Sequence, residues 1–171
     1  LLKRAESLIE QKRYDEAEQA LLQALEKKAN LATARYNLGL VYEGKGQPEQ
    51  AMAAYEGELA QNANAYRAAF NLAKLLQAAG RPGDAVRRFR QAVDVQADFG
   101  TGQLYLAKAL LDAGDLAGAE EWARKGLGAK PDPRLAPLGH LVLADVYNRQ
   151  GRAADAEREV ARARRLQRSA T

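Results

Sequence analysis

Apolar residues recur along this chain every three or four positions, and short polar or glycine-containing segments interrupt the pattern at regular intervals. This spacing is typical of amphipathic α-helices. In residues 36–42 the apolar side chains share one helical face. A turn follows at 44–48, and Ala51, Tyr55 and Leu59 then mark a second face. The pattern predicts two helices joined by a short turn.

The helix pair is repeated with a step of 34 residues. Three columns of residues keep this step: Ala17, Ala51, Ala85 and Ala119; Gly46, Gly80 and Gly114; and Asn30, Asn64, Asp98 and Asp132. Because residues of different types keep one register, a single supersecondary unit is copied end to end. Such units stack into an elongated all-α array instead of a globule.

Five repeat units are expected, at about residues 1–31, 32–65, 66–99, 100–133 and 137–168. A linker insertion at 134–136 separates the last two units. It lies in a proline-rich segment that cannot continue a helix, so we expect a longer loop there and a changed angle between these units. Residues 1–4 read as the middle of a helix, and the chain is therefore expected to be part of a longer protein.

Residues at the ends of the predicted helices suit their positions. Gly46 lies where a first helix ends in a left-handed residue, which glycine adopts without steric penalty. Pro48 and Pro82 begin second helices, where a missing N–H costs little. The polar column that starts at Asn30 is expected to cap the next helix, with each cap contributing about 1 kcal/mol.

Two columns of small residues predict close packing of the paired helices. One column lies midway along each first helix and the other begins each second helix: Ala5, Gly39, Ala73, Ala107 and Ala144, and Ala17, Ala51, Ala85, Ala119 and Ala156. Larger apolar side chains are expected to fill the space between successive pairs.

These columns resemble the tetratricopeptide repeat, a 34-residue helix–turn–helix with Leu-Gly…Tyr in its first helix and Ala…Phe…Ala…Pro in its second. The matching residues are Leu38-Gly39-x-x-Tyr42…Ala51…Tyr55 in one unit and Leu72-Ala73-x-x-Leu76…Ala85…Phe89…Ala92 in the next. The resemblance covers the chain in five units, the first of them truncated. It implies a right-handed α–α superhelix of antiparallel helix pairs that serves as a protein-interaction scaffold. The departures from the family pattern are Glu58 and Gly126, at a column of small residues, and Arg35, Ala69, Gln103 and His140, where the family often has Trp.

The first helices of such an array line its concave side, which forms an extended binding surface. Helical periodicity places the following residues in this groove: Tyr36, Asn37, Leu40, Arg67, Phe70, Asn71, Lys74, Thr101, Leu104, Tyr105 and Lys108. The cations Arg67, Lys74 and Lys108 would attract an extended, partly acidic peptide or protein segment. The amides of Asn37 and Asn71 could hold a peptide backbone, or they could only hydrogen-bond neighbouring helices. Both interpretations stay open at this point.

The composition offers few groups for catalysis. Cysteine is absent and His140 is the single histidine, so a thiol nucleophile and a histidine metal site both lack their residues. We expect His140 to pack at a helix–helix contact. The glycines at 80–83 and 100–102 lack the Lys-Ser/Thr of a phosphate loop. The chain is therefore expected to be no enzyme and to bind no cofactor or metal.

Charge and hydropathy narrow the classes of partner. The formal net charge of +4 is a mild bias along a long array and does not require nucleic acid. Arg158, Arg162 and Arg165 share one face of the helix predicted at about 153–167, but no aromatic stacking platform accompanies them, which disfavours nucleic acid binding. No run of 18 apolar residues exists, so membrane insertion is not expected. The alternative to a binding scaffold is a structural or oligomerisation arm, whose first helix would pack on an N-terminal domain or on a second copy of the chain.

Overall fold

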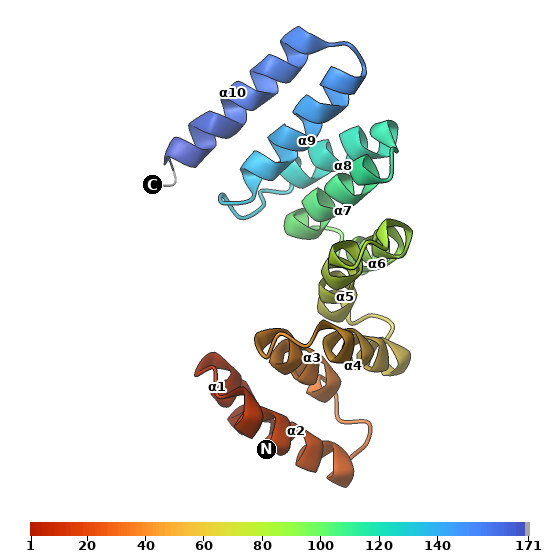
Figure 1. The fold of residues 1–171 in the computed structure, drawn as a ribbon, viewed down its shortest axis with the longest axis vertical. Coiled ribbons are helices and arrows are strands. Elements are labelled where there is room, and N and C mark those ends of the chain that lie inside the picture. Colours follow the sequence, from red (N-terminus) through yellow and green to blue (C-terminus); the bar gives the residue numbers. More distant parts are fainter. Residues whose placement is uncertain (170–171) are drawn as a thin grey trace. The chain divides into compact units, whose positions relative to one another are not determined.

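The structure is a computed structural model that describes residues 1–169, and within this range the chain forms ten α-helices and no strand (Figure 1). The helices are α1 (Leu2–Glu10), α2 (Tyr14–Lys27), α3 (Ala34–Gly44), α4 (Pro48–Gln61), α5 (Tyr66–Ala78), α6 (Pro82–Val95), α7 (Gly100–Asp112), α8 (Leu116–Gly128), α9 (Ala136–Arg149) and α10 (Ala153–Ser169). The predicted all-α class, built from pairs of antiparallel helices, is confirmed.

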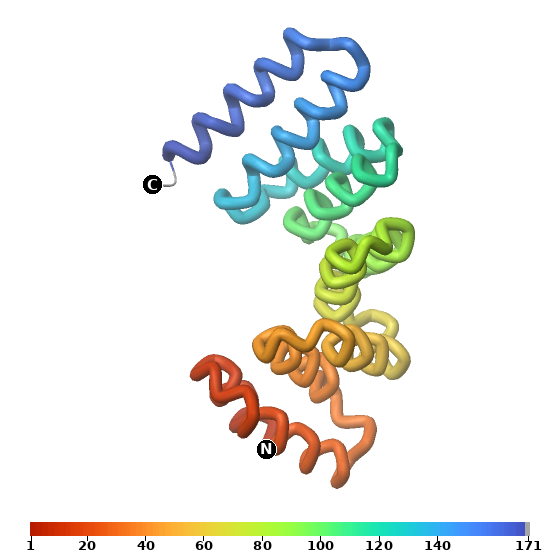
Figure 2. The backbone as a smooth tube through the Cα atoms, viewed as in Figure 1, coloured from red at the N-terminus to blue at the C-terminus, as the bar shows by residue number. Residues whose placement is uncertain are grey.

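The chain divides into two compact units, Leu1–Ala79 and Gly80–Thr171. Unit 1 contains α1 to α5, and unit 2 contains α6 to α10. Figure 2 traces the path of the backbone within each unit. The division falls between α5 and α6, inside the repeat expected at 66–99. The boundaries of the five repeats stay a prediction.

The turns inside the helix pairs depend on a left-handed residue. Gly46 has a φ of +68°, and three further glycines of the same column have φ between +73° and +85°. Lys12 occupies this column in the first pair and has a φ of +58°. A left-handed conformation costs a non-glycine residue about 1–2 kcal/mol, so the first hairpin turn carries strain that the others avoid. Pro48 and Pro82 begin α4 and α6, as predicted.

The predicted capping by the polar column is wrong. At the starts of α3, α5, α7 and α9 the residue in the N-cap position makes no side-chain capping hydrogen bond. Asn64 and Asp98 instead accept from the next helix through their backbone carbonyls, and the Asp132 carboxylate accepts from the N–H of Arg134 inside the loop. These side chains lie too early in the connections to reach the free N–H groups of the helices. Asp115, which the sequence analysis did not select, does cap α8, by accepting from the N–H of Gly118 at 2.9 Å.

The N-terminus of α3 is capped from another helix. Glu58 of α4 is buried, and its two carboxylate oxygens accept from the N–H groups of Thr33 and Tyr36, both at 3.3 Å. A carboxylate is well placed there, because free N–H groups and the helix dipole make that end of a helix positive. The departure from a small residue at position 58 therefore has a structural reason.

Two residues at the column where the family often has Trp hydrogen-bond to the loops that precede their helices. Arg35 Nη1 donates to the carbonyl of Ala29 at 2.6 Å, and Gln103 Nε2 donates to the carbonyl of Ala97 at 2.8 Å. Each donor reaches the residue six positions earlier, so the polar substitutes for Trp perform equivalent tasks in the two units.

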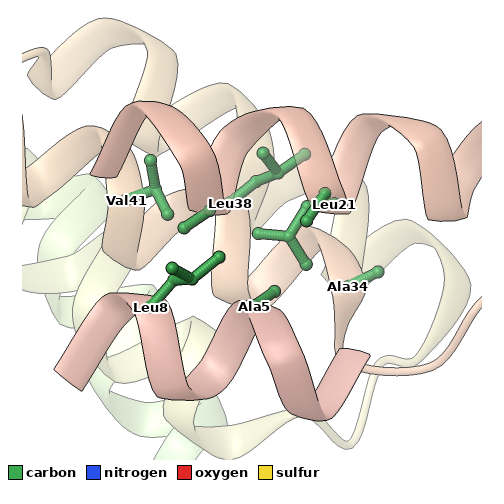
Figure 3. Close-up of a cluster of buried hydrophobic side chains, with 8 residues drawn as sticks. Ala5, Leu8, Leu21, Ala34, Leu38 and Val41 are labelled. Carbon is green, nitrogen blue, oxygen red and sulfur yellow. The ribbon is translucent and has the colours of Figure 1, made fainter. Parts of the chain in front are cut away.

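The core of unit 1 lies between α1, α2 and α3 (Figure 3). Its labelled side chains are Ala5, Leu8, Leu21, Ala34, Leu38 and Val41, all buried. Next to this cluster the Tyr55 ring packs directly on Gly39, where an added Cβ would lie 2.2 Å from Cε1. The column of small residues therefore allows close approach of the helices, as predicted.

The core of unit 2 uses glycine in the same way. Leu104 packs against Gly126 and Gly139, where an added Cβ would lie 2.6 Å and 2.8 Å from Leu104 Cδ2. Residues 129–135 connect α8 to α9, whereas residues 96–99 suffice between α6 and α7. The longer loop that the proline-rich segment predicted is present.

Candidate functional site

The residues predicted to line a groove are divided between the two units. Unit 1 contains seven of them: Tyr36, Asn37, Leu40, Arg67, Phe70, Asn71 and Lys74. Unit 2 contains Thr101, Leu104, Tyr105 and Lys108, all on α7. Each set is therefore described within its own unit.

A hydrogen-bonded cluster lies behind the predicted residues of unit 1. The Tyr55 hydroxyl donates to Glu43 Oε2 at 2.5 Å and accepts from Asn71 Nδ2 at 3.2 Å. The Tyr36 ring lies next to it, with its centroid 5.9 Å from that of Tyr55. The side chain of Tyr55 is fully buried, and through it the cluster joins α3, α4 and α5.

The environment keeps both phenols neutral. Burial, followed by the hydrogen bond to Glu43, raises the pKa of Tyr55. Burial also raises the pKa of Tyr36, while the positive charge of Arg67 opposes part of that rise. Because an ordinary tyrosine already ionises near pH 10, both hydroxyls keep their protons at neutral pH and remain hydrogen-bond donors.

Cations and aromatic rings alternate on the surface in front of this cluster. Arg67 is exposed, and its guanidinium carbon lies 5.8 Å from the centroid of the Tyr66 ring, whose hydroxyl accepts from Arg67 Nε at 3.2 Å. Lys74 Nζ lies 5.3 Å from the centroid of the Phe70 ring. These distances place both cations within the range of cation–π attraction. We call Tyr36, Leu40, Arg67, Phe70 and Lys74 the α3–α5 face.

The two asparagines differ in their surroundings although they are equivalent in the repeat. Asn71 is 9% exposed and bonded to Tyr55, whereas Asn37 is 5% exposed and its Nδ2 has no hydrogen-bond partner among the described residues. Sixteen positions before Asn71 stands Tyr55, and sixteen positions before Asn37 stands Leu21, which has no hydroxyl. The packing interpretation accordingly has a physical basis for Asn71.

The predicted residues of α7 have mixed environments in unit 2. Leu104 is fully buried against the two core glycines, so its side chain presents no surface. Tyr105 is half-buried, with its ring centroid 6.0 Å from that of Phe89. Lys108 Nζ lies 2.5 Å from Asp112 Oδ1, and Thr101 is half-buried. Thr101, Tyr105 and Lys108 are the members of this set that retain exposed surface.

Sequence reasoning missed the cluster that supports the α3–α5 face. The sequence pattern places Tyr55 on an apolar helical face and indicates no partner for its hydroxyl. A signal existed in the separation of sixteen residues between Tyr55 and Asn71, which the pair Phe89 and Tyr105 repeats as a contact between rings.

Two further properties of the described part of the chain bear on function. Among residues 1–169, no three or more His, Asp or Glu side chains are grouped so that they could hold a metal ion. Of the helices in that range, none has the length and apolar character needed to cross a bilayer.

Comparison with known protein families gives three matches of one kind. Models of the tetratricopeptide repeat match residues 70–133 and 137–162, and a TPR repeat model matches residues 5–46. No curated protein matches the chain.

Solved structures resemble the chain along its length. The crystal structure of MamA has a TM-score of 0.86 and 16% sequence identity, covering 96% of this chain and 95% of that one. MamA from residue 41 to its end, from Desulfovibrio magneticus RS-1, has a TM-score of 0.84 and 17% identity, with coverages of 98% and 93%. The crystal structure of YrrB, a TPR protein with an unusual peptide-binding site, has a TM-score of 0.85 and 20% identity, with coverages of 97% and 84%.

At such low identity these likenesses establish the fold and not the function. The fold, the repeated columns and the three family matches agree with one another. The chain belongs to the tetratricopeptide repeat family.

Proposed function

We propose that this protein is an interaction scaffold and that the α3–α5 face of unit 1 binds an extended peptide segment of a partner protein. The observation that carries the proposal is the cluster of Glu43, Tyr55 and Asn71, which ties together the helices that present the face. A surface that is already held in place loses little conformational entropy when a ligand binds.

The chemistry of the face indicates the class of partner. Arg67 and Lys74 provide positive charge, and Phe70 and Tyr36 provide aromatic surface beside it. The nearby carboxylate of Glu43 accepts a hydrogen bond from the Tyr55 hydroxyl, so one of its oxygens is already engaged and less available to a ligand. A segment that places an acidic side chain next to an apolar one fits this arrangement. YrrB, which has the same fold, has a peptide-binding site, and this supports peptide binding as a capacity of such helix pairs.

The α7 residues Thr101, Tyr105 and Lys108 form a second surface of the same proposal, in unit 2. Lys108 offers the positive charge there, although its ion pair with Asp112 must open first. Exposed pairs of this kind contribute about 0–1 kcal/mol, so an acidic ligand can displace Asp112 at little cost.

The proposal is tested by selecting peptides from a display library with the intact chain and measuring their affinities by fluorescence polarisation. A dissociation constant of a few µM, about −8 kcal/mol, is expected for a transient scaffold. The double variant Arg67→Glu and Lys74→Glu should bind at least about tenfold more weakly, because repulsion replaces attraction on the face.

The matched control is Lys27→Glu with Lys28→Glu, which changes the net charge by the same amount at an exposed end of α2. It should bind within about twofold of the unaltered chain at 0.15 M salt, where charges beyond about 8 Å are screened. Equal losses in both variants would assign the attraction to overall charge. Unchanged affinity in the face variant would show that the peptide binds elsewhere.

A further inference from the structure

A cationic pocket lies in unit 2 between α8, α9 and α10, and none of its lining residues belongs to the proposed peptide-binding surfaces. Its volume is about 390 Å³. Four arginines line it, and we call it the arginine pocket: Arg124 from α8, Arg152 from the turn before α10, and Arg158 and Arg162 from α10. Leu127, Leu143 and Tyr147 add apolar surface, and His140 also lines the pocket.

Tyr147 positions two of the arginines that come from different elements. Its hydroxyl accepts from Arg124 Nη2 at 2.8 Å, while the guanidinium carbon of Arg152 lies 4.2 Å from the centroid of its ring. Arg124 also pairs with Glu120, which does not line the pocket, at 2.6 Å. One buried side chain therefore holds guanidinium groups from α8 and from the start of α10 beside the same space.

The arginines of α10 are held along one side of the helix by two acidic residues. Asp155 pairs with Arg152 at 2.8 Å and with Arg158. Glu159 pairs with Arg162 at 2.7 Å and lies 2.6 Å from Nδ1 of His140. Counted over arginines and carboxylates alone, the lining has four arginines against two carboxylates, an excess of two positive charges.

The ion pairs of the pocket are of the kind that an incoming anion can displace. The side chains of the four arginines are 45–66% exposed, so water screens their pairs with the partly exposed Glu120 and Asp155. Glu159 is buried, and it keeps His140 as a second partner when Arg162 turns to a ligand. A guanidinium presents five N–H donors in a planar fork, and only some of them are engaged here. Phosphate oxygens accept such forks two at a time, in short charge-assisted hydrogen bonds.

We propose that the arginine pocket binds a phosphate monoester carried by a partner peptide, that is, a phosphorylated side chain. The group carries nearly two negative charges at neutral pH, which matches the excess of two positive charges. The apolar surface of Leu127 and Leu143 suits the carbon atoms next to the phosphate. This inference rests on the proposed function in assuming a peptide partner, but it concerns a different surface.

The same features argue against a polynucleotide as the occupant. Binding of single strands combines a positive groove with exposed aromatic rings on which bases stack. Tyr147 is the aromatic residue of the pocket, and it is 5% exposed and covered by Arg152. A phosphate can enter this pocket, whereas a base would find no ring on which to stack.

The test uses the intact chain and a fluorescein-labelled peptide with the sequence Gly-Ala-Leu-phosphoserine-Leu-Ala-Gly. Its unphosphorylated form, inorganic phosphate and a single-stranded DNA of 12 nucleotides serve as comparison ligands. We expect the phosphopeptide to bind at least about tenfold more tightly than the unphosphorylated peptide and than free phosphate, because charge and apolar contacts act together.

Substitutions locate the binding. Arg158→Gln with Arg162→Gln should weaken phosphopeptide binding at least about tenfold, since it removes two phosphate donors. The matched control, Arg165→Gln with Arg168→Gln, removes two arginines of the same helix that do not line the pocket, and it should leave the affinity within about twofold at 0.15 M salt. Circular dichroism melts of both variants confirm that α10 remains folded.

Four outcomes would overturn the inference. They are equal affinity for the phosphorylated and unphosphorylated peptides; equal affinity for inorganic phosphate and the phosphopeptide, which would assign the pocket to a free anion; equal losses in the two arginine variants; and tighter binding of the DNA through the same arginines. The Arg67→Glu, Lys74→Glu variant should bind the phosphopeptide normally. Failure of this inference is thereby distinguishable from failure of the proposed function.

Discussion

Asn71 donates a hydrogen bond of 3.2 Å to the buried hydroxyl of Tyr55, whereas the amide nitrogen of Asn37, its equivalent 34 residues earlier, has no partner within residues 1–169. The repeat therefore preserves the residue type without preserving the interaction. A buried polar group without a partner is costly, whereas a bonded one contributes to stability.

The two asparagines should respond in opposite ways to the same substitution. Asn71→Leu is expected to lower the free energy of unfolding by about 1 kcal/mol or more, because it removes a bonded group from the Tyr55 hydroxyl. Asn37→Leu is expected to leave it unchanged or raise it, because a side chain whose buried amide nitrogen has no partner is replaced by an apolar group of similar size. Urea denaturation of the two single variants measures the difference, and equal losses would contradict the assigned roles.

The trans-helix cap formed by Glu58 gives a second prediction. Glu58→Ala should lower the free energy of unfolding by about 1–2 kcal/mol, since two N–H groups at the start of α3 lose their acceptor. Glu56→Ala, an exposed position on the same helix, is the control and should change stability by less than about 0.5 kcal/mol. Both values come from urea melts. If Glu58→Ala lowers the free energy of unfolding no more than Glu56→Ala does, the cap does not contribute to stability.

Acid should weaken the ion pairs at the mouth of the arginine pocket. Hydrogen bonding with Arg152, followed by the charges of Arg152 and Arg158, lowers the pKa of Asp155 below its ordinary value of 3.8. A carboxyl whose pKa is lower in the folded state stabilises the fold at pH values above the unfolded pKa, and this contribution is lost as the pH falls through the folded value. The carbon-13 shift of the Asp155 carboxyl, followed by NMR, should therefore titrate with a midpoint below 3.8. A midpoint at or above that value would show that the arginines do not hold this carboxylate.

Self-association separates the scaffold from the alternative of an oligomerisation arm. The large apolar residues exposed in the described range are Leu1, Leu22, Val95 and Leu141. Leu22, Val95 and Leu141 come from different helices, and single exposed apolar residues are ordinary on a monomer surface. Multi-angle light scattering should therefore return the monomer mass of 18.6 kDa. This mass should hold from about 10 µM to about 500 µM, because a self-associating arm would gain mass with concentration. A dimer mass at the upper end would favour the alternative.

The sequence was most informative at repeated positions where the residue type alone determines the local structure. The glycine column predicted the left-handed turn at Gly46, and the alanine columns predicted where helices approach closely. Both follow from the shape of one residue in one backbone conformation, so counting positions is enough. The proline-rich segment after α8 predicted a longer connection for the same reason.

Relationships between helices were beyond the sequence. In the sequence, Glu58 is only a departure from a column of small residues. Its role is not visible there, because the N–H groups that donate to its carboxylate lie twenty-two and twenty-five positions earlier. Leu104 had the periodicity of a surface residue, yet the glycines opposite it draw it into the core. In the sequence, the arginines of α10 form only the charged face of a helix. That they line one pocket with Arg124 of α8 follows from the packing of α8, α9 and α10, which the sequence does not give.

The lysine at position 12 gives the first hairpin a property that its glycine-bearing counterparts lack. Its backbone has a positive φ, which residues other than glycine rarely adopt, and among the turns within helix pairs only the one between α1 and α2 has a non-glycine residue in this conformation. An exchange for glycine at this bend would relieve the tension and leave every buried contact untouched. Of the turns within helix pairs in residues 1–169, the first is therefore the one where a single exchange for glycine would add stability.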